Sequence, residues 1–393
     1  MHHTFASPCA AALAAILLAS ACAPASGPPA PSRAPTPAVS ASTSGTGSAP
    51  TSAAAPTTRP TPPTATKVRF GAQFIAGDVP AFVAAERGYF REEVIDIEMV
   101  RFGGSPEMVP ALSTGQVETA GAGGATAMWN AIARGVPMRM VVDKGTFRPG
   151  HGFTALVARK DLYDSGRVRR LEDLRGVSLG TLPPGRGGAN MALLSVGLSR
   201  VGGSLDDLDI QSITFPDMIA AFANGALETG LMAEPFLTRA SKQGSIVRIM
   251  GQDEMYPNFT VSAVVFTPAL YADRPTAKAY VRAYIRGIRD YLTAISGSAG
   301  EAERTRMEQL MAGYTGIDAA TVHEMIPASF NPNGLINQES LIFGYQYYRQ
   351  EGLIPEPVSE AAMAAVWGTE LVEEVLGELG RLPDDFGLRP DAR

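Results

Sequence analysis

Cysteine is the scarcest reactive residue of this chain. Among its 393 residues only Cys9 and Cys22 are cysteines, and both lie close to the N-terminus. The chain after Cys22 therefore lacks the thiols that a disulfide framework, an iron–sulfur cluster or a cysteine-ligated zinc site would require. We expect the folded part of the chain to be stabilised by packing alone.

Histidine and clustered charge are also sparse. His151 and His323 stand apart, without the spacing of a metal site. The formal net charge is −6, and there is no stripe of Lys and Arg of the kind that binds nucleic acid. No nucleophile with a neighbouring base stands out either. These absences predict a protein with no metal, no cofactor, no nucleic-acid partner and no catalytic residues, and hence no enzyme.

A membrane-spanning apolar run is missing as well. The apolar segment that ends at Leu17-Leu18-Ala19-Ser20-Ala21 is far shorter than the ~20 residues needed to cross a bilayer. Because Cys22 follows it directly, the segment resembles a bacterial lipoprotein signal. Residues 1–22 are then a signal peptide ending at a lipidated Cys22, which places the protein on the extracytoplasmic face of a cell membrane. The alternatives are a secretory signal cut near Ala21, and a cytoplasmic protein with a misread start.

Residues 23–66 consist mainly of Pro, Ala, Ser, Thr and Gly. Such a segment cannot bury enough apolar surface to offset its ordering entropy. It therefore predicts a disordered, fairly stiff tether. The remainder, in a chain that is 45% hydrophobic, is long enough for two domains that begin at Lys67.

An internal repeat is the clearest pattern in this remainder. Residues 105–119 match residues 215–229 position by position, with Pro, an acid, Met, Gly, Glu and Thr in step. Each copy has Pro near a helix start and Gly where the helix should stop, and a short strand should follow. Chance similarity is the alternative.

The segments around the two copies also correspond. Expected strands cover 68–71, 95–99, 138–142, 177–181 and 246–250, and expected helices cover 80–87, 125–134, 189–200 and 235–241. Strand–helix alternation indicates parallel α/β units, here in two similar lobes. Ligands of such sheets bind beyond the carboxyl ends of the strands. Four loops rich in Gly or Pro should therefore converge on one cleft, at 76–79, 121–124, 184–188 and 233–236.

Several stretches resemble one known family. They are Ala84–Glu93, Ala111–Glu118, Ala133–Pro137, Leu171–Gly176 and Ala233–Phe236. In this order they resemble the periplasmic-type solute-binding proteins of ABC importers, in the branch of nitrate-, sulfonate- and thiamine-pyrimidine-binding proteins. The resemblance implies an α/β fold of the periplasmic-binding-protein type II class, with two lobes, a hinge of two crossover strands and a ligand cleft between the lobes. Lobe 1 would consist of residues 67–155 and 268–393, and lobe 2 of residues 160–255. The hinge would consist of residues 156–159 and 260–267.

The resemblance also implies a function. The chain would be a monomeric lipoprotein that captures a small sulfonate-, carboxylate- or pyrimidine-like solute by lobe closure and delivers it to ABC permease subunits. One alternative is an enzyme of the pyrimidine-synthase-like branch, although the cysteine-rich motif of that branch is absent. Another is a ligand-sensing module without transport.

The candidate ligand-binding residues fall in the loops and near the second crossover. Arg186 could clamp an anion, or it could be a solvated loop arginine. Glu234 and Asp78 could accept hydrogen bonds from the ligand, or could cap helices. The Gly–Gly–Ala–Thr segment at 123–126 could approach the ligand closely, or could reflect tight packing, and Trp129 is expected in the core. The full set is Asp78, Gly123, Gly124, Ala125, Thr126, Arg186, Gly187, Gly188, Ala189, Glu234, Phe236, Asn258 and Phe259.

Overall fold

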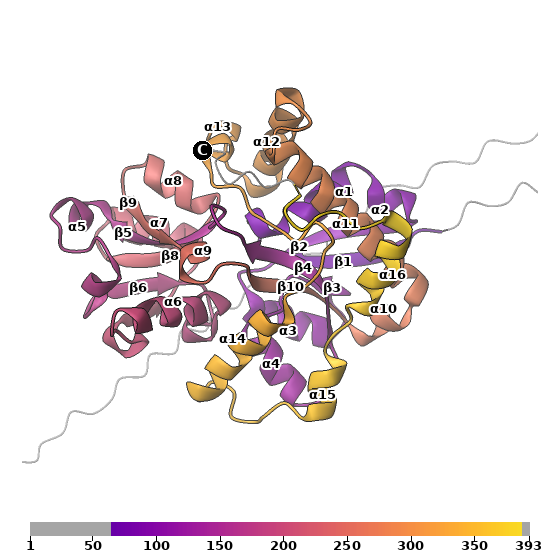
Figure 1. Ribbon diagram of the computed structural model, residues 1–393, viewed down its shortest axis with the longest axis horizontal. Helices are drawn as coiled ribbons and strands as arrows, with labels where there is room; N and C mark the ends of the chain where they lie inside the picture. Colours follow the sequence, from indigo (N-terminus) through magenta and orange to yellow (C-terminus); the bar gives the residue numbers. More distant parts are fainter. Residues whose placement is uncertain (1–63, 387–393) are drawn as a thin grey trace, which may run out of the picture. The chain divides into compact units, whose positions relative to one another are not determined.

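The computed structural model describes residues 64–386 (Figure 1). The expected signal peptide with Cys22, and the expected tether up to residue 63, lie outside the described residues. The first strand opens at Thr66, one residue before the expected start of the fold.

The strands form two five-stranded sheets. The first sheet has the order β2-β1-β3-β10-β4, and the second has the order β7-β6-β8-β5-β9. The strands are β1 (Thr66–Ala72), β2 (Ile95–Arg101), β3 (Thr119–Ala120), β4 (Arg139–Phe147), β5 (Thr154–Arg159), β6 (Ser178–Thr181), β7 (Asp209–Ser212), β8 (Thr229–Ala233), β9 (Ile246–Gly251) and β10 (Phe259–Phe266). We call each sheet with the helices packed on it a half of the molecule.

Helices follow most strands, as the alternating pattern predicts. They are α1 (Val79–Glu86), α2 (Tyr89–Glu92), α3 (Ser105–Ser113), α4 (Thr126–Ala133), α5 (Lys160–Asp164), α6 (Ala189–Arg200), α7 (Phe215–Ala223), α8 (Phe236–Lys242), α9 (Gln252–Met255), α10 (Pro268–Ala272), α11 (Arg274–Ile295), α12 (Glu301–Thr315), α13 (Ala319–Glu324), α14 (Gln338–Gln350), α15 (Glu360–Ala365) and α16 (Glu370–Leu379). Within residues 64–386, none of these helices combines the length and apolar character needed to cross a membrane.

The sheets are mixed, where the sequence pattern indicates only parallel units. β1 pairs in parallel with β2 and β3, and β6 pairs in parallel with β7 and β8. In contrast, β10 runs antiparallel to β3 and β4, and β5 runs antiparallel to β8 and β9. β10 and β5 are the strands that follow directly after the chain passes from one sheet to the other.

The two sheets share one topology, which supports the internal repeat over chance similarity. Replacing β1, β2, β3, β4 and β10 by β6, β7, β8, β9 and β5 converts the first strand order into the second, with α3 and α7 in matching places. The repeated acids also act alike. Glu118 accepts the backbone N–H of Arg69 at 2.7 Å, and Glu228 accepts the backbone N–H of Ser178 at 2.9 Å. The repeated Glu is therefore structural.

The crossing segments differ from the expected hinge. The chain leaves the first sheet through residues 148–153 and returns through residues 252–258. Residues 156–159, expected in the hinge, lie in β5 and are paired on both sides, while residues 260–266 lie in β10. Most residues of both segments are apolar and buried, and both segments pair with strands on either side, so they are central strands of a sheet rather than free connections.

The C-terminal helices pack mainly on the first half. α11 buries Tyr280, Tyr284, Ile288 and Tyr291 along one face and lies against α1. α14 lies beside α4 and β10 and also touches α6 of the second half (Figure 1). Trp129 is fully buried, with its ring centroid 5.1 Å from that of Tyr345, which confirms its expected place in the core.

Candidate functional site

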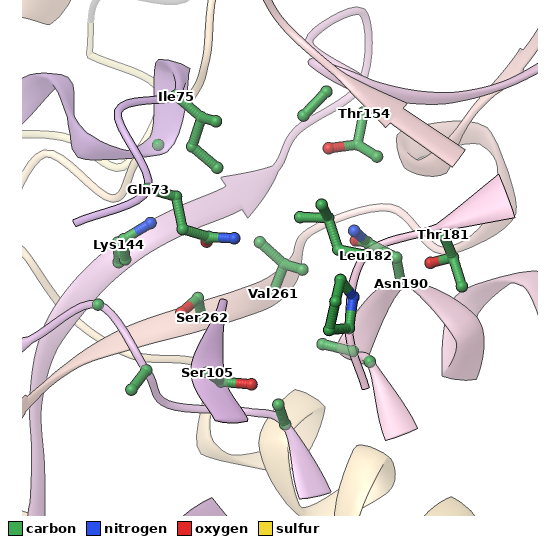
Figure 2. A pocket seen from close by; sticks show the side chains of 18 of the residues that line it. Gln73, Ile75, Ser105, Lys144, Thr154, Thr181, Leu182, Asn190, Val261 and Ser262 are labelled. Atoms are coloured by element: carbon green, nitrogen blue, oxygen red, sulfur yellow. The ribbon is translucent and has the colours of Figure 1, made fainter. Parts of the chain in front are cut away.

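A cavity of about 110 Å³ lies between the two halves. We call it the inner cavity (Figure 2). All four loops expected to converge contribute to its wall, through Gly77, Gly121, Ala122, Gly123, Pro184, Gly188 and Ala233. The strand ends and helix starts of both sheets meet there, as the rule for open α/β sheets predicts.

Lys144 lies near the end of β4. Among the residues that the structure describes, it is the one charged side chain in the wall of the inner cavity. Its Nζ lies 2.9 Å from Oδ1 of Asp78, and both side chains are almost fully buried. The other carboxylate oxygen of Asp78 accepts the backbone N–H groups of Gln73 and Ile75 at 3.1 and 3.2 Å. Asp78, a predicted ligand contact, thus lies behind Lys144 and holds it in place.

Gly121 makes room for the Lys144 side chain. A Cβ atom at Gly121 would lie only 1.9 Å from Cε of Lys144, far inside van der Waals contact. A residue without a side chain is therefore required here for the lysine to reach the cavity.

The remaining polar wall is made of amides and hydroxyls, which can all donate hydrogen bonds. Gln73, Ser105 and Ser262 come from the first half, and Thr154, Thr181 and Asn190 from the second (Figure 2). The Gln73 amide points toward the middle of the cavity. This wall suits a ligand rich in hydrogen-bond acceptors.

Helix starts add to this preference. α3 and α7 begin with Ser105 and Phe215 in the wall, and α4 and α6 begin just after the wall residues Ala125 and Gly188. The first turns of helices carry unpaired N–H groups and a partial positive charge. Together with Lys144 they favour an anionic group in the inner cavity.

Four of the predicted site residues line the inner cavity, namely Gly123, Ala125, Gly188 and Ala189. Gly124 does not. It has φ +99°, its Cβ position is 2.7 Å from the carbonyl oxygen of Val261, and its own carbonyl accepts the hydroxyl of Tyr348 at 2.9 Å. Tight packing, the alternative for this segment, explains Gly124.

Thr126 and Gly187 contact each other across the two halves. Oγ1 of Thr126 donates to the carbonyl oxygen of Gly187 at 3.1 Å, beside the cavity and outside its wall. A Cβ at Gly187 would lie 2.2 Å from that Oγ1. The pair therefore joins loops of the two halves beside the inner cavity.

Arg186 does not occupy the position of an anion clamp. Its guanidinium pairs with Asp206 at 2.7 Å and with Glu351 at 3.0 Å, and donates to the carbonyl of Leu205 at 2.9 Å. It is absent from the wall of the inner cavity. Because Glu351 follows α14, Arg186 instead links the second half to the C-terminal helices.

Glu234 is buried and serves mainly as a helix cap. Its carboxylate accepts the backbone N–H and the hydroxyl of Thr238 at 3.0 and 2.9 Å, and the N–H of Ile326 at 3.2 Å. Burial raises the pKa of Glu234 to about 7, against the lowering effect of these hydrogen bonds. Capping, the alternative stated for this residue, accounts for its contacts.

Three predicted aromatic and amide contacts lie elsewhere. Phe236 packs on Phe215 with ring centroids 5.3 Å apart and lines a neighbouring cavity. The N–H of Asn258 donates to the carbonyl of Phe147 at 2.6 Å, and Phe259 packs against Tyr256 at 5.2 Å. Neither Asn258 nor Phe259 lines the inner cavity: Phe259 packs against Phe343 of α14, and Asn258 lines a different cavity.

Sequence reasoning missed Lys144, as well as the six neutral donors of the cavity wall. The expected strand stopped at Val142, whereas β4 continues to Phe147. Two adjacent charges, Asp143 and Lys144, after an apolar run are unusual in a buried strand. These adjacent charges could have indicated a site residue, since charged residues in buried strands are commonly paired or functional.

The part of the chain that the structure describes contains no group of three or more His, Cys, Asp or Glu that could hold a metal ion. Nδ1 of His323 lies 2.9 Å from Oε1 of Glu308, away from the inner cavity.

A family model described as NMT1/THI5 like matches residues 77–294. A search of the curated proteins gives no match. Solved structures are similar throughout the fold. The alkanesulfonate-binding protein SsuA from Xanthomonas axonopodis pv. citri, bound to MOPS, matches with a TM-score of 0.61 and 19% identity, covering 78% of this chain and 98% of that one.

Two further structures are informative. The periplasmic nitrate-binding protein NrtA from Synechocystis PCC 6803 has a TM-score of 0.68 and 14% identity, covering 83% of this chain and 92% of its own. The desulfurization enzyme DSZB has a TM-score of 0.57 and 13% identity, covering 80% and 99%. At these identities the likeness establishes the fold, which is that of the type II periplasmic binding proteins, as expected.

Proposed function

The chain belongs to the NMT1/THI5-like family, and on that premise we propose that it is the extracytoplasmic solute-binding protein of an ABC importer. It binds a small organic anion between its two halves and presents the closed form to a permease. The lipidated Cys22 and the Pro-rich segment after it tether the protein to the membrane.

One observation carries this proposal. The inner cavity lies between the halves, and its donors come from both of them, with Lys144 on one side and Thr154, Thr181 and Asn190 on the other. A ligand that contacts both halves stabilises the arrangement in which they meet. The contacts between Thr126 and Gly187 and between Arg186 and Glu351 belong to that arrangement.

The comparisons are consistent with an anionic solute. Two of the similar structures are named for binding alkanesulfonate and nitrate, which are both anions. Lys144, with helix starts and neutral donors around it, provides the same kind of environment here.

An enzymatic function is the second candidate, favoured by the likeness to a desulfurization enzyme. A cysteine nucleophile is excluded between residues 64 and 386, because both cysteines of the chain lie before them. The amine of Lys144 is held by Asp78 as an ion pair, which opposes nucleophilic attack by this group. Release of product from candidate solutes, followed by chromatography, tests this alternative directly.

The binding experiment is a thermal-shift and calorimetric screen of the full chain with nitrate, acetate, methanesulfonate and taurine, with glycerol and uracil as uncharged probes. A ligand of the folded state raises the melting temperature. The double variant Asp78→Asn/Lys144→Met removes the cation without leaving a lone buried carboxylate, and should weaken anion binding about ten- to a hundredfold. Binding of the uncharged probes alone, or full anion binding by the double variant, would refute an anion site at Lys144.

The membrane anchor has its own test. Intact mass of the protein extracted from membranes should correspond to a chain that begins at Cys22 and carries a diacylglycerol group. A chain that begins elsewhere, without lipid, would exclude the anchor and leave the binding proposal intact.

A further inference from the structure

We infer that the solute carries an aromatic tail, which lies in a second chamber next to the inner cavity. This inference rests on the proposed function, since it extends the same binding site outward. The second chamber, which we call the outer chamber, has a volume of about 390 Å³. It shares the wall residues Gln73, Ile75, Leu182 and Phe215 with the inner cavity.

The shared residues make the two spaces direct neighbours, with a common wall drawn from both halves. Gln73 and Ile75 come from the loop after β1, and Leu182 follows β6 on the opposite half (Figure 2). A ligand held at Lys144 that passes Gln73 and Leu182 would enter the outer chamber and remain between residues of the two halves. The outer chamber is the larger of the two, so the greater part of such a ligand would lie there.

The wall of the outer chamber differs in character from that of the inner cavity. Three phenylalanines, Phe102, Phe215 and Phe236, line it together with the apolar Ile75 and Leu182. The rings of Phe215 and Phe236 lie 5.3 Å apart at 29°. Aromatic ligands gain specific ring–ring contacts in addition to apolar burial in such surroundings.

Phe102 is firmly positioned for this role. It follows β2 directly, its N–H donates to the carbonyl of Ala72 at 2.9 Å, and its ring packs close to Gly71, whose Cβ position lies 3.1 Å from Cε2 of Phe102. A fixed ring contributes to binding without the entropic cost of ordering a mobile side chain.

Arg101 sets the charge preference of the outer chamber. Its guanidinium lies 3.8 Å from the centroid of the Phe74 ring, and among the described residues it is the one charged side chain of this wall. Of the residues described between 64 and 386, the wall of each space thus contains one cationic side chain and no anionic one. A cationic tail is disfavoured, and the ligand class is an aryl-substituted oxyanion, with a sulfonate or a carboxylate as the head group.

The test is a matched series measured by calorimetry on the full chain. Methanesulfonate, hexanesulfonate, benzenesulfonate and naphthalene-2-sulfonate form one arm, and acetate, benzoate and 2-naphthoate form the other. The aryl compounds should bind at least about tenfold more tightly than the methyl compounds of the same arm, and benzenesulfonate more tightly than hexanesulfonate. The arm with the higher affinities identifies the head group.

Phe102→Ala should remove most of the gain from the ring and leave methanesulfonate or acetate binding unchanged, while Phe102→Leu should retain part of that gain. Phe343→Ala, which alters an aromatic residue outside both spaces, is the matched control. Equal affinities for methyl and aryl compounds, or an equal loss for both in Phe102→Ala, would overturn the outer chamber as a subsite. If no anion of either arm binds, the proposed function itself fails, whereas binding of the methyl compounds alone defeats only this inference.

Discussion

Lys144 and Asp78 form an ion pair of 2.9 Å in which both side chains are almost completely shielded from water. The second oxygen of Asp78 is held by two backbone N–H groups, so the carboxylate has a fixed orientation. Two further Nζ hydrogens of Lys144 remain for other acceptors. Since Lys144 lines the inner cavity, a ligand oxygen is the natural partner for them.

Lys144→Met should therefore destabilise the protein as well as weaken anion binding. Removing one member of a buried ion pair leaves an uncompensated charge, at a cost of about 3–5 kcal/mol. Adding Asp78→Asn should recover a large part of this loss but none of the binding. Urea unfolding of the single and double variants measures the coupling between the two residues.

The control for Lys144→Met is Lys160→Met. Lys160 pairs with Asp164 at 2.8 Å, but both side chains are about half exposed. Solvated pairs of this kind contribute little to stability, so the control should unfold at nearly the same urea concentration as the wild type. Additive effects in the Asp78/Lys144 cycle would show that the pair does not act as a unit.

Gly121→Ala should displace Lys144 while changing no charge. The new methyl group would lie 1.9 Å from the Lys144 Cε, so the lysine side chain must move out of its position. Binding should fall by at least about tenfold, because the position of the cation determines the contact. Calorimetry with an anion that binds the wild type is the measurement.

Gly313→Ala is the matched control for this substitution. Gly313 lies within α12, and a Cβ there has no neighbour within 4 Å. Alanine should stabilise this helix by about 0.5–1 kcal/mol without altering binding. A Gly121→Ala protein that binds as tightly as the wild type would mean that Lys144 is dispensable for the ligand.

Gly187→Ala should prevent the two halves from meeting fully. The added Cβ would lie 2.2 Å from Oγ1 of Thr126, which belongs to the other half. With a bound solute, the variant should keep a larger radius of gyration in solution scattering than the wild type. Thr126→Ala removes the clashing atoms, so the double variant should regain the compact value. A single variant that compacts like the wild type would argue against closure at this contact.

The helices and strands could be predicted well from the sequence, because the signals that start and end them lie within a few neighbouring residues. The two repeated helices were expected from Pro near their starts and Gly after their ends, and α3 and α7 form there. The four convergent loops followed from the strand–helix alternation and do line the inner cavity. These inferences needed only neighbouring residues and the general rules of parallel sheets.

Long-range pairing could not be predicted in the same way. From its Gly-rich loop, Arg186 could be predicted to bind an anion. In the fold, Glu351 from the C-terminal region pairs with its guanidinium instead. Asp78 and Lys144 are likewise brought together only because the end of β4 packs against the loop that follows β1. No local pattern shows which charged residue will find its partner within the protein and which will face the ligand.

Glu234 should make the stability of the fold depend on pH. Burial raises its pKa from the usual 4.5 to about 7, so between these values the folded state keeps a proton that the unfolded state has lost. The contribution to the free energy of unfolding is therefore fully present below about pH 4.5 and is lost as the pH rises through about 7. Asp143, whose pKa burial raises to about 6, acts in the same direction.

Glu234→Gln tests this dependence. The amide cannot ionise, so the variant should gain stability relative to the wild type as the pH rises from 5 to 8, in urea unfolding at several pH values. Glu360→Gln, at an exposed position at the start of α15, should follow the wild-type curve throughout. If Glu234→Gln also parallels the wild type, Glu234 ionises with an ordinary pKa, and its hydrogen bonds to Thr238 and Ile326 outweigh the effect of burial.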